Sequence, residues 1–114
     1  MEYLKTAFER EKELKKELSR LKAEIIRKIN PERILLFGSL AGKSINTLSD
    51  LDLMIIHQSE MSFKKRMDYI YTNIDRNEET DMFWYTPEEI ERLKRRSSFV
   101  RHAVQNARSI YEKR

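Results

Sequence analysis

A glycine-serine pair, followed at a fixed distance by two aspartates, constrains this chain more than any other feature. Gly38 and Ser39 are followed by ten residues and then by Asp50 and Asp52, which are separated by one residue. Glycine lets a backbone approach a ligand closely, and Ser39 offers a hydroxyl and an N–H group at the expected start of a helix, from residues 40–41 onward. The pair therefore predicts an anion-binding turn beside two carboxylates.

Apolar runs at residues 34–37 and 53–56 flank this segment and predict a strand on each side of it. Alternate residues of a strand point to the same face, so Asp50 and Asp52 are expected to project together. Two neighbouring carboxylates repel each other unless a cation lies between them. Magnesium prefers carboxylate and phosphate oxygens, so the pattern predicts metal-assisted phosphoryl chemistry.

With this spacing and these flanking strands, the chain resembles the minimal nucleotidyltransferases of the DNA polymerase β-like superfamily. Their signature is Gly-Ser, ten residues and Asp-x-Asp, and a later expected strand at 80–85 carries a third acid, Asp81. By that resemblance Asp50, Asp52 and Asp81 are the catalytic and metal-binding residues. The first two would bind the metals that hold the nucleotide, and the third would complete the site where the acceptor hydroxyl is deprotonated. The glycine-serine pair would bind phosphate.

The resemblance also implies substrates and partners. It implies a two-metal Mg²⁺ site, ATP as the donor, and transfer of AMP to a hydroxyl with release of pyrophosphate. The smallest members are adenylyl-transferring antitoxins, whose acceptor is a tyrosine of a HEPN toxin ribonuclease. One departure concerns Gly42 and Lys43, which stand where the family commonly has arginine followed by glycine. A phosphate contact by Lys43 is therefore not part of the prediction.

Two other functions remain open on the sequence. One is an inactive nucleotide-binding or protein-binding module that neutralises a partner by contact, through its charged N-terminal helix. The other is an enzyme that modifies nucleic-acid ends, using the basic run between Arg92 and Arg96. The net charge is +4, but no aromatic residue is interleaved with that run, so a solvated helix face is favoured over nucleic-acid binding.

Length and composition predict one small domain spanning residues 1–114. The chain is 39% hydrophobic and has no cysteine, which excludes disulfides and thiolate metal sites. No stretch approaches the roughly 20 apolar residues that span a membrane. The first 20 residues are charged throughout and do not resemble a secretion signal, so the expected location is the cytoplasm.

A long amphipathic helix is expected near the N-terminus. Four apolar residues recur at helical spacing and predict a helix to about residue 28: Leu14, Leu18, Leu21 and Ile25. Asn30 and Pro31 are expected to end it. The charged residues 9–13 could project as a partner or homodimer surface, or could be a frayed first half of the helix.

Further elements follow from spacing and capping signals. A helix at about 62–75 should cross over to the strand at 80–85, and a capping box from Thr86 to Glu89 should start a helix ending near residue 95. A last helix, capped by Ser97 or Ser98, is expected to run to residue 110 or 111. The expected fold is α/β and nucleotidyltransferase-like: a small mixed sheet of three or more strands, helices mainly on one side, and a long N-terminal helix.

Overall fold

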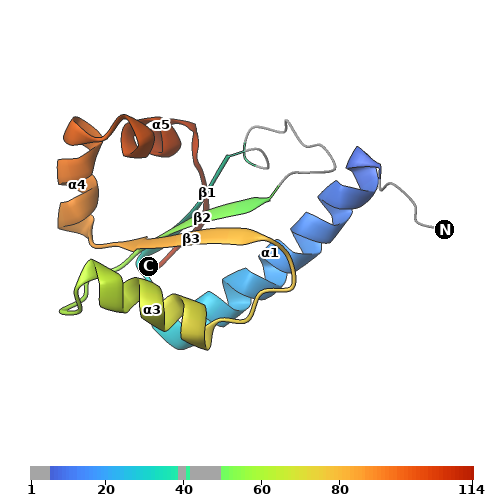
Figure 1. The fold of residues 1–114 in the computed structure, drawn as a ribbon, viewed down its shortest axis with the longest axis horizontal. Coiled ribbons are helices and arrows are strands. Elements are labelled where there is room, and N and C mark those ends of the chain that lie inside the picture. Colours follow the sequence, from blue (N-terminus) through green and yellow to red (C-terminus); the bar gives the residue numbers. More distant parts are fainter. Residues whose placement is uncertain (1–5, 39–40, 42–49) are drawn as a thin grey trace.

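The computed structural model describes residues 6–38, 41 and 50–114, and shows a sheet between two layers of helices (Figure 1). The helices are α1 (Ala7–Ile29), α3 (Phe63–Asn73), α4 (Pro87–Arg96) and α5 (Ser98–Asn106), and the strands are β1 (Arg33–Phe37), β2 (Leu51–Ile56), β3 (Thr80–Tyr85) and β4 (Arg108–Glu112). The strand order is β3-β2-β1-β4. β1 is antiparallel to β2 and β4, whereas β2 and β3 are parallel and joined through α3.

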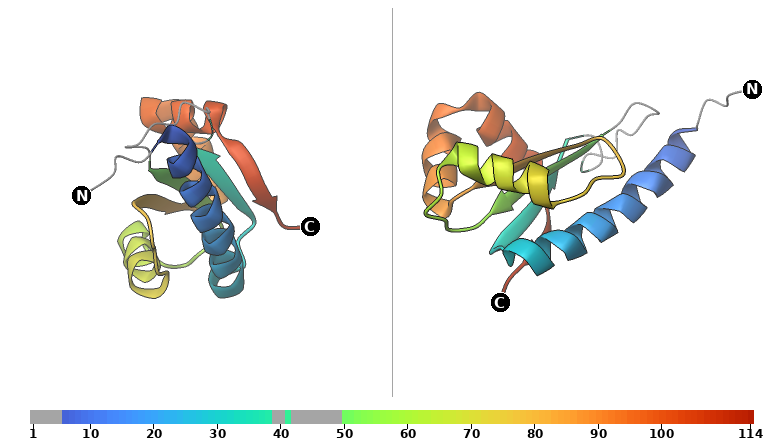
Figure 2. Two further views of the ribbon diagram at one scale, coloured as in Figure 1. Left: turned by 90° about the vertical axis from the view of Figure 1, so that its right-hand side faces the viewer. Right: turned by 60° about the horizontal axis from the view of Figure 1, so that its bottom comes forward.

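The α/β class, the mixed sheet and the long N-terminal helix are therefore confirmed. The expectation that the helices lie mainly on one side of the sheet needs correction. α1 and α3 cover one face, and α4 and α5 cover the other (Figures 1 and 2). The reason lies in the strands, which are apolar on both faces: Ile34 and Leu36 are buried under α1, and Leu35 and Phe37 under the opposite layer. A strand of this kind needs cover on both sides.

α1 forms because its apolar residues fall on one stripe and both of its ends are capped. The Thr6 hydroxyl accepts a hydrogen bond from the Glu9 N–H at 3.0 Å, and Asn30 ends the helix in a left-handed conformation with φ 53°. Leu14, Leu21 and Ile25 lose all solvent contact against the sheet. Each such burial contributes about 2 kcal/mol, so the stripe fixes the helix to the sheet.

Contacts with the loop before β3 fix the charged first half of α1. Arg10 pairs with Glu78, and the buried Glu17 accepts hydrogen bonds from the backbone N–H of Asn77 and from Arg20. Arg20 also donates to the backbone oxygen of Asp75 at 2.6 Å. Within residues 9–13, the ion pair of Arg10 with Glu78 therefore attaches the helix to this loop. The helix begins at Ala7, so residues 9–13 are helical.

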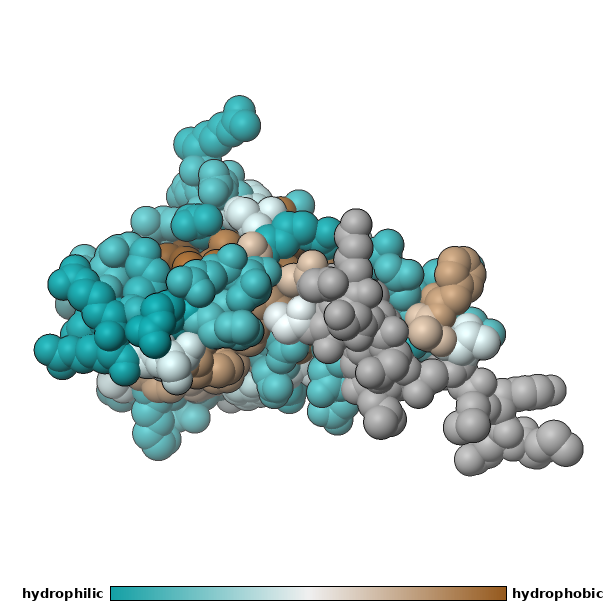
Figure 3. Space-filling view, turned by 90° about the horizontal axis from the view of Figure 1, so that it is seen from above, coloured by the Kyte–Doolittle hydropathy of each residue, from teal (hydrophilic) through white to brown (hydrophobic). Residues whose placement is uncertain are grey.

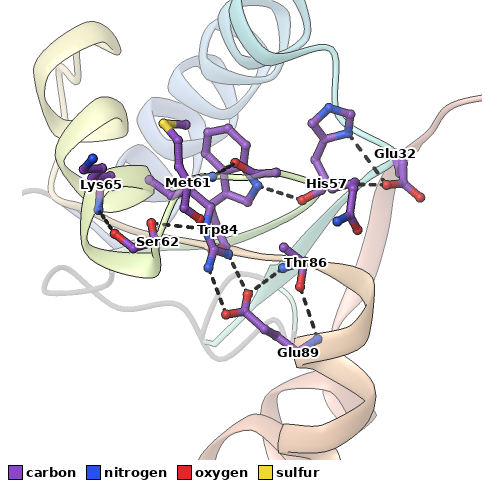
Figure 4. A network of polar contacts seen from close by, with 11 residues as sticks. Glu32, His57, Met61, Ser62, Lys65, Trp84, Thr86 and Glu89 are labelled. Carbon is purple, nitrogen blue, oxygen red and sulfur yellow. Dashed lines mark hydrogen bonds and ion pairs between the residues drawn. The ribbon is translucent and has the colours of Figure 1, made fainter.

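A bidentate ion pair joins α3 and α4, and Figure 4 shows its acidic partner, Glu89, beside Thr86. Arg66 is 3% exposed and donates to both carboxylate oxygens of Glu89, at 2.6 and 2.8 Å. Glu89 also accepts from the N–H of Thr86, whose hydroxyl accepts from the N–H of Glu89 in return. This is the expected capping box, and it sets where α4 leaves the sheet.

The end of the chain differs from the sequence prediction. α5, capped by Ser97, ends at Asn106, and Ala107 turns to extended backbone at ψ 153°. Residues 108–112 then form β4 against β1, so the expected helix to residue 110 or 111 is wrong in its last turn. The alanine and aromatic spacing fits a helix, but the free edge of β1 offers backbone hydrogen bonds that a helix cannot use. Tertiary pairing therefore overrides the local pattern.

No helix in the described ranges is long and apolar enough to cross a bilayer.

Candidate functional site

The turn after β1 brings a glycine backbone against an aspartate side chain. Gly38 has φ +76°, a conformation that side chains other than glycine rarely adopt. A Cβ atom at this position would lie 2.2 Å from Oδ2 of Asp52, which is inside any allowed contact. The position therefore requires glycine for two reasons, its backbone angle and the space that the Asp52 carboxylate occupies.

Asp52 and Asp81 are neighbours across the parallel pair of β2 and β3. They are register partners, and Phe37 on β1 is the partner of Asp52 on its other side. Along each strand alternate side chains share a face, and the two aspartates lie on the face covered by α4 and α5. Asp50 immediately precedes β2 and is half-buried, as is Asp52, while Asp81 is exposed. The topology thus brings all three predicted acids to one end of the β2–β3 pair.

Burial and negative charge both act on Asp52. Loss of solvent and the neighbouring carboxylates of Asp81 and Asp50 raise the pKa of Asp52 to about 6. The two neighbouring carboxylates act in the same direction as burial, because like charges close together disfavour ionisation of Asp52. Repulsion between the carboxylates raises the free energy of the folded protein. A cation bound between them would offset this repulsion.

The carboxylates of Asp50, Asp52 and Asp81 meet some of the requirements of a magnesium site. In the described ranges, no three carboxylates or imidazoles already stand as a ready-made metal cluster. Magnesium commonly takes only one or two protein carboxylates and completes its shell with water and phosphate oxygens. The pair of Asp52 and Asp81, with Asp50 beside it, fits that requirement through its oxygen chemistry and its mutual repulsion.

Three phenylalanines border the acids and were not part of the predicted site. Phe37 and Phe83 have ring centroids 6.3 Å apart, and Phe99 meets both edge-on at 6.0 and 5.9 Å. Phe83 follows Asp81 by two residues and so shares its face, while Phe99 on α5 is 51% exposed. The two-residue spacing was a sequence signal for Phe83. Phe99 gave none, because only the packing of α5 brings it here.

The position of Asp81 depends on the loop that leads into β3. α1 binds this loop through Arg10 and Glu17, as described above, and the Leu51 N–H donates to the Glu79 oxygen at 3.1 Å. That last bond joins the starts of β2 and β3. The three contacts hold Asp81 level with Asp52.

Part of the glycine-serine segment lies outside the described residues, and one histidine lies away from the acids. Ser39 and Lys43 lie outside the described residues, as does most of the expected helix after Gly38, of which Ala41 is described and helical. His57 follows the far end of β2, beside Trp84, whose indole N–H donates to the His57 oxygen at 2.9 Å. His57 therefore does not contribute to the acidic site.

The basic run lies on the last turn of α4. Arg92, Arg95 and Arg96 are exposed, and Lys94 pairs with Glu91 at 3.0 Å. The surface seen from the side of α4 and α5 is mainly hydrophilic, with hydrophobic area only in patches (Figure 3). Basic residues at the C-terminal end of a helix also interact favourably with its dipole, so the run has a structural role without any ligand.

Comparison with known proteins agrees with this geometry. The family described as "Polymerase beta, Nucleotidyltransferase" matches residues 19–114, which is most of the chain. A solved structure from Sulfolobus solfataricus, provisionally named a nucleotidyltransferase, has a TM-score of 0.70 and 21% identity, covering 99% of this chain and 93% of that one. That likeness shows the fold, and no curated protein matches the chain. The family match and the fold together show that the chain belongs to the polymerase β-like nucleotidyltransferases.

Proposed function

We propose that this protein is an Mg²⁺-dependent enzyme that transfers AMP from ATP to a hydroxyl acceptor and releases pyrophosphate. Its family generally uses magnesium and a nucleoside triphosphate. The observation that carries the proposal is the placement of Asp52, which lies beside Asp81 on the neighbouring strand and close to the Gly38 turn. Such a transfer would need carboxylates that hold the metal and a turn that binds phosphate beside them, and the closeness of Gly38 to Asp52 supports that assignment.

Each acid has a distinct task in this proposal. Asp50 and Asp52 would hold the magnesium ions that bind the triphosphate, and Asp81 would bind the catalytic ion and help to remove the proton of the attacking hydroxyl. Bound magnesium would neutralise charge on the transferring and leaving phosphates. Gly38 has no side chain of its own, and the Asp52 carboxylate fills the space beside it, so a metal ion held by Asp52 would lie close to this turn. The oxygen–phosphorus bond to the acceptor forms as the bond to pyrophosphate breaks, in line with it.

For the acceptor we propose a tyrosine of a HEPN toxin ribonuclease, which would make this protein a cytoplasmic antitoxin. Support comes from the resemblance to the smallest nucleotidyltransferases, which rests on the spacing of Gly38, Asp50 and Asp52.

The proposal is tested with ATP labelled at either the α or the γ phosphate. The protein is incubated with magnesium and a co-purified HEPN partner, beside the Asp50→Asn/Asp52→Asn variant as control. We expect label from α-labelled ATP on the partner, none from γ-labelled ATP, and none with the variant. Label from the γ position would indicate phosphorylation and contradict the proposal, and so would equal labelling by the variant.

A contact-only antitoxin is the second candidate, and one observation favours it. Phe8 on the first turn of α1 is 67% exposed, although it is a large apolar residue. If contact alone neutralises the partner, Phe8→Ser should weaken partner binding and Asp52→Asn should leave both binding and neutralisation intact. If transfer is required, Asp52→Asn alone should abolish neutralisation.

A further inference from the structure

Two phenylalanine rings lie directly beside the acids on the α4–α5 face of the sheet. Phe37 on β1 is the register partner of Asp52, and Phe83 follows Asp81 by two residues on β3. The ring centroids of the two phenylalanines are 6.3 Å apart. Two residues along a strand span about 7 Å, which is the scale of the ribose that separates the α-phosphate of a nucleotide from its base. A nucleotide bound at the acids therefore has aromatic rings within reach of its base.

Phe99 on α5 completes this group and is its most exposed member. Its ring meets Phe37 at 6.0 Å and Phe83 at 5.9 Å between centroids. Phe37 is buried and Phe83 is half-buried, whereas Phe99 is 51% exposed. The residues that fix α5 to the sheet are the buried Val100 and Ala103, so the packing of this helix does not require a large apolar side chain at position 99. The exposed ring is thus free to contact a ligand.

A second exposed phenylalanine lies at the other end of β3 and allows a direct comparison. Phe63 is 39% exposed and stacks on Tyr85 with ring centroids 5.5 Å apart. Tyr85 is the last residue of β3, whereas Asp81 is the second. The guanidinium carbon of Arg66 also lies 5.6 Å from the centroid of the Phe63 ring. Phe63 therefore resembles Phe99 in type and exposure but is remote from the acids.

We propose that Phe99 and Phe83 form the platform on which the base of the donor nucleotide stacks. The inference rests on the proposed function, because it takes the triphosphate of the same nucleotide to lie at Asp52 and the Gly38 turn. Every nucleobase has a flat π-face, and aromatic side chains bind bases by stacking on that face. The carboxylates cannot supply such a contact. The aromatic group adds it next to them, on the strands that carry Asp52 and Asp81 or pair with them.

The position of the platform decides which ligand it binds. Its rings adjoin the Gly38 turn through Phe37, which immediately precedes the glycine. The base is joined covalently to the phosphates at that turn, whereas an aromatic side chain of the acceptor has no such link. We therefore assign the platform to the adenine of ATP. Stacking tolerates different bases, so the platform distinguishes a nucleotide from a bare polyphosphate more strongly than it distinguishes one base from another.

The test is titration calorimetry with magnesium and two ligands, a non-hydrolysable ATP analogue and inorganic tripolyphosphate, which has the phosphates but no base. Phe99→Ala should weaken binding of the analogue at least about fivefold and leave binding of tripolyphosphate unchanged. Phe99→Trp should retain the affinity for the analogue, because an indole ring also stacks on a base. Phe63→Ala, the same truncation at the other exposed phenylalanine, is the matched control and should bind both ligands like the natural protein.

The outcomes separate this inference from the proposed function. If Phe99→Ala binds the analogue as tightly as the natural protein, the platform is refuted and the metal–phosphate site is not. Equal weakening of both ligands also refutes it, since Phe99 would then act on the phosphates rather than on the base. Normal analogue binding with a raised KM for the acceptor protein would assign the rings to the acceptor instead. A natural protein that binds neither ligand with magnesium would overturn the proposed function together with this inference.

Discussion

At the scale of single residues, the ionised Asp52 carboxylate reduces the stability of the folded domain. Its folded pKa of about 6 lies above the ordinary value of 3.8, so the folded state holds the proton more tightly than the unfolded state. The contribution of Asp52 to stability is therefore most favourable below pH 3.8 and is lost as the pH rises through about 6. At neutral pH, without metal, the full penalty is present.

Replacing Asp52 by asparagine should therefore stabilise the protein while removing its activity. The two pKa values set an upper bound of about 3 kcal/mol, which partial solvent contact reduces to about 1 kcal/mol. Urea unfolding at pH 7.5 without metal should show this gain. Magnesium should raise the midpoint of the natural protein and not that of the variant. Asp68→Asn, an exposed change on α3, is the matched control, and a loss of stability in Asp52→Asn would contradict the prediction.

Gly38 should tolerate no side chain. Gly38→Ala is expected to cost about 1–3 kcal/mol because of its positive φ, and to displace the Asp52 carboxylate, which the new Cβ would meet. Magnesium-dependent nucleotide binding should fall at least tenfold. Asn30→Ala is the matched control, since Asn30 also has a positive φ and lies at the end of α1. It should lose comparable stability and keep full binding, and equal loss of binding in both would remove the specific role of Gly38.

The sequence predicted the acids but not their energetics. The spacing of Gly38, Asp50 and Asp52 is a local pattern, and Asp81 lies on a strand that could be recognised from its own residues. The raised pKa of Asp52 depends on burial and on charges from another strand, and Phe99 reaches the site only through the packing of α5. Neither can be obtained from spacing.

At the scale of elements, the ion pair of Arg66 and Glu89 connects α3 to α4. Hydrogen bonds from Arg66, together with those from Thr86, hold the pKa of Glu89 at about 2, well below 4.5. This stabilisation is complete above pH 4.5 and is lost as the pH falls toward 2. It amounts to about 3 kcal/mol at most.

Glu89→Gln should cost about 3 kcal/mol at pH 7, because it leaves the buried Arg66 without its charge partner. The difference from the natural protein should shrink between pH 4.5 and pH 2, and urea unfolding at several pH values in that range measures it. Glu91→Gln, on the same helix in an exposed pair with Lys94, should change stability by less than about 1 kcal/mol. A pH-independent difference would refute the ion-pair explanation.

The β3 edge gives a second element-scale prediction. Tyr71→Phe removes the hydroxyl that bonds both backbone groups of Met82, and should cost up to about 1 kcal/mol because water can replace it in part. The Met82 amide should exchange its hydrogen faster than in the natural protein, as measured by NMR. Tyr69→Phe, whose hydroxyl makes only a 3.5 Å bond to the Lys28 oxygen, should leave that amide unchanged. Unchanged exchange in Tyr71→Phe would show that the edge is not held by this contact.

Local signals predicted most elements well. β3 and the start of α4 were expected where they occur, because alternation and a capping box are encoded within six residues. β4 could not be predicted, since its residues fit a helix and its pairing depends on β1, more than 70 residues earlier. The helix layers on both faces likewise depend on how α4 and α5 return over the sheet.

At the scale of the whole molecule, α1 and the sheet form one support for the acids. α1 packs under β1 and β2 and binds the loop that carries the chain into β3, so its position affects Asp81 through Glu78 and Asn77. The acids lie at one end of the sheet, and the open edge of β4 is separate from them.

Titration calorimetry with magnesium and a non-hydrolysable ATP analogue tests most directly whether Asp52 and Asp81 form one nucleotide site, because it requires no acceptor. We expect binding by the natural protein only when magnesium is present, and affinities at least tenfold weaker in both Asp52→Asn and Asp81→Asn. The Asp68→Asn variant should bind like the natural protein. Equal binding in Asp81→Asn, or binding without magnesium that neither variant weakens, would contradict a shared metal–nucleotide site at the ends of β2 and β3.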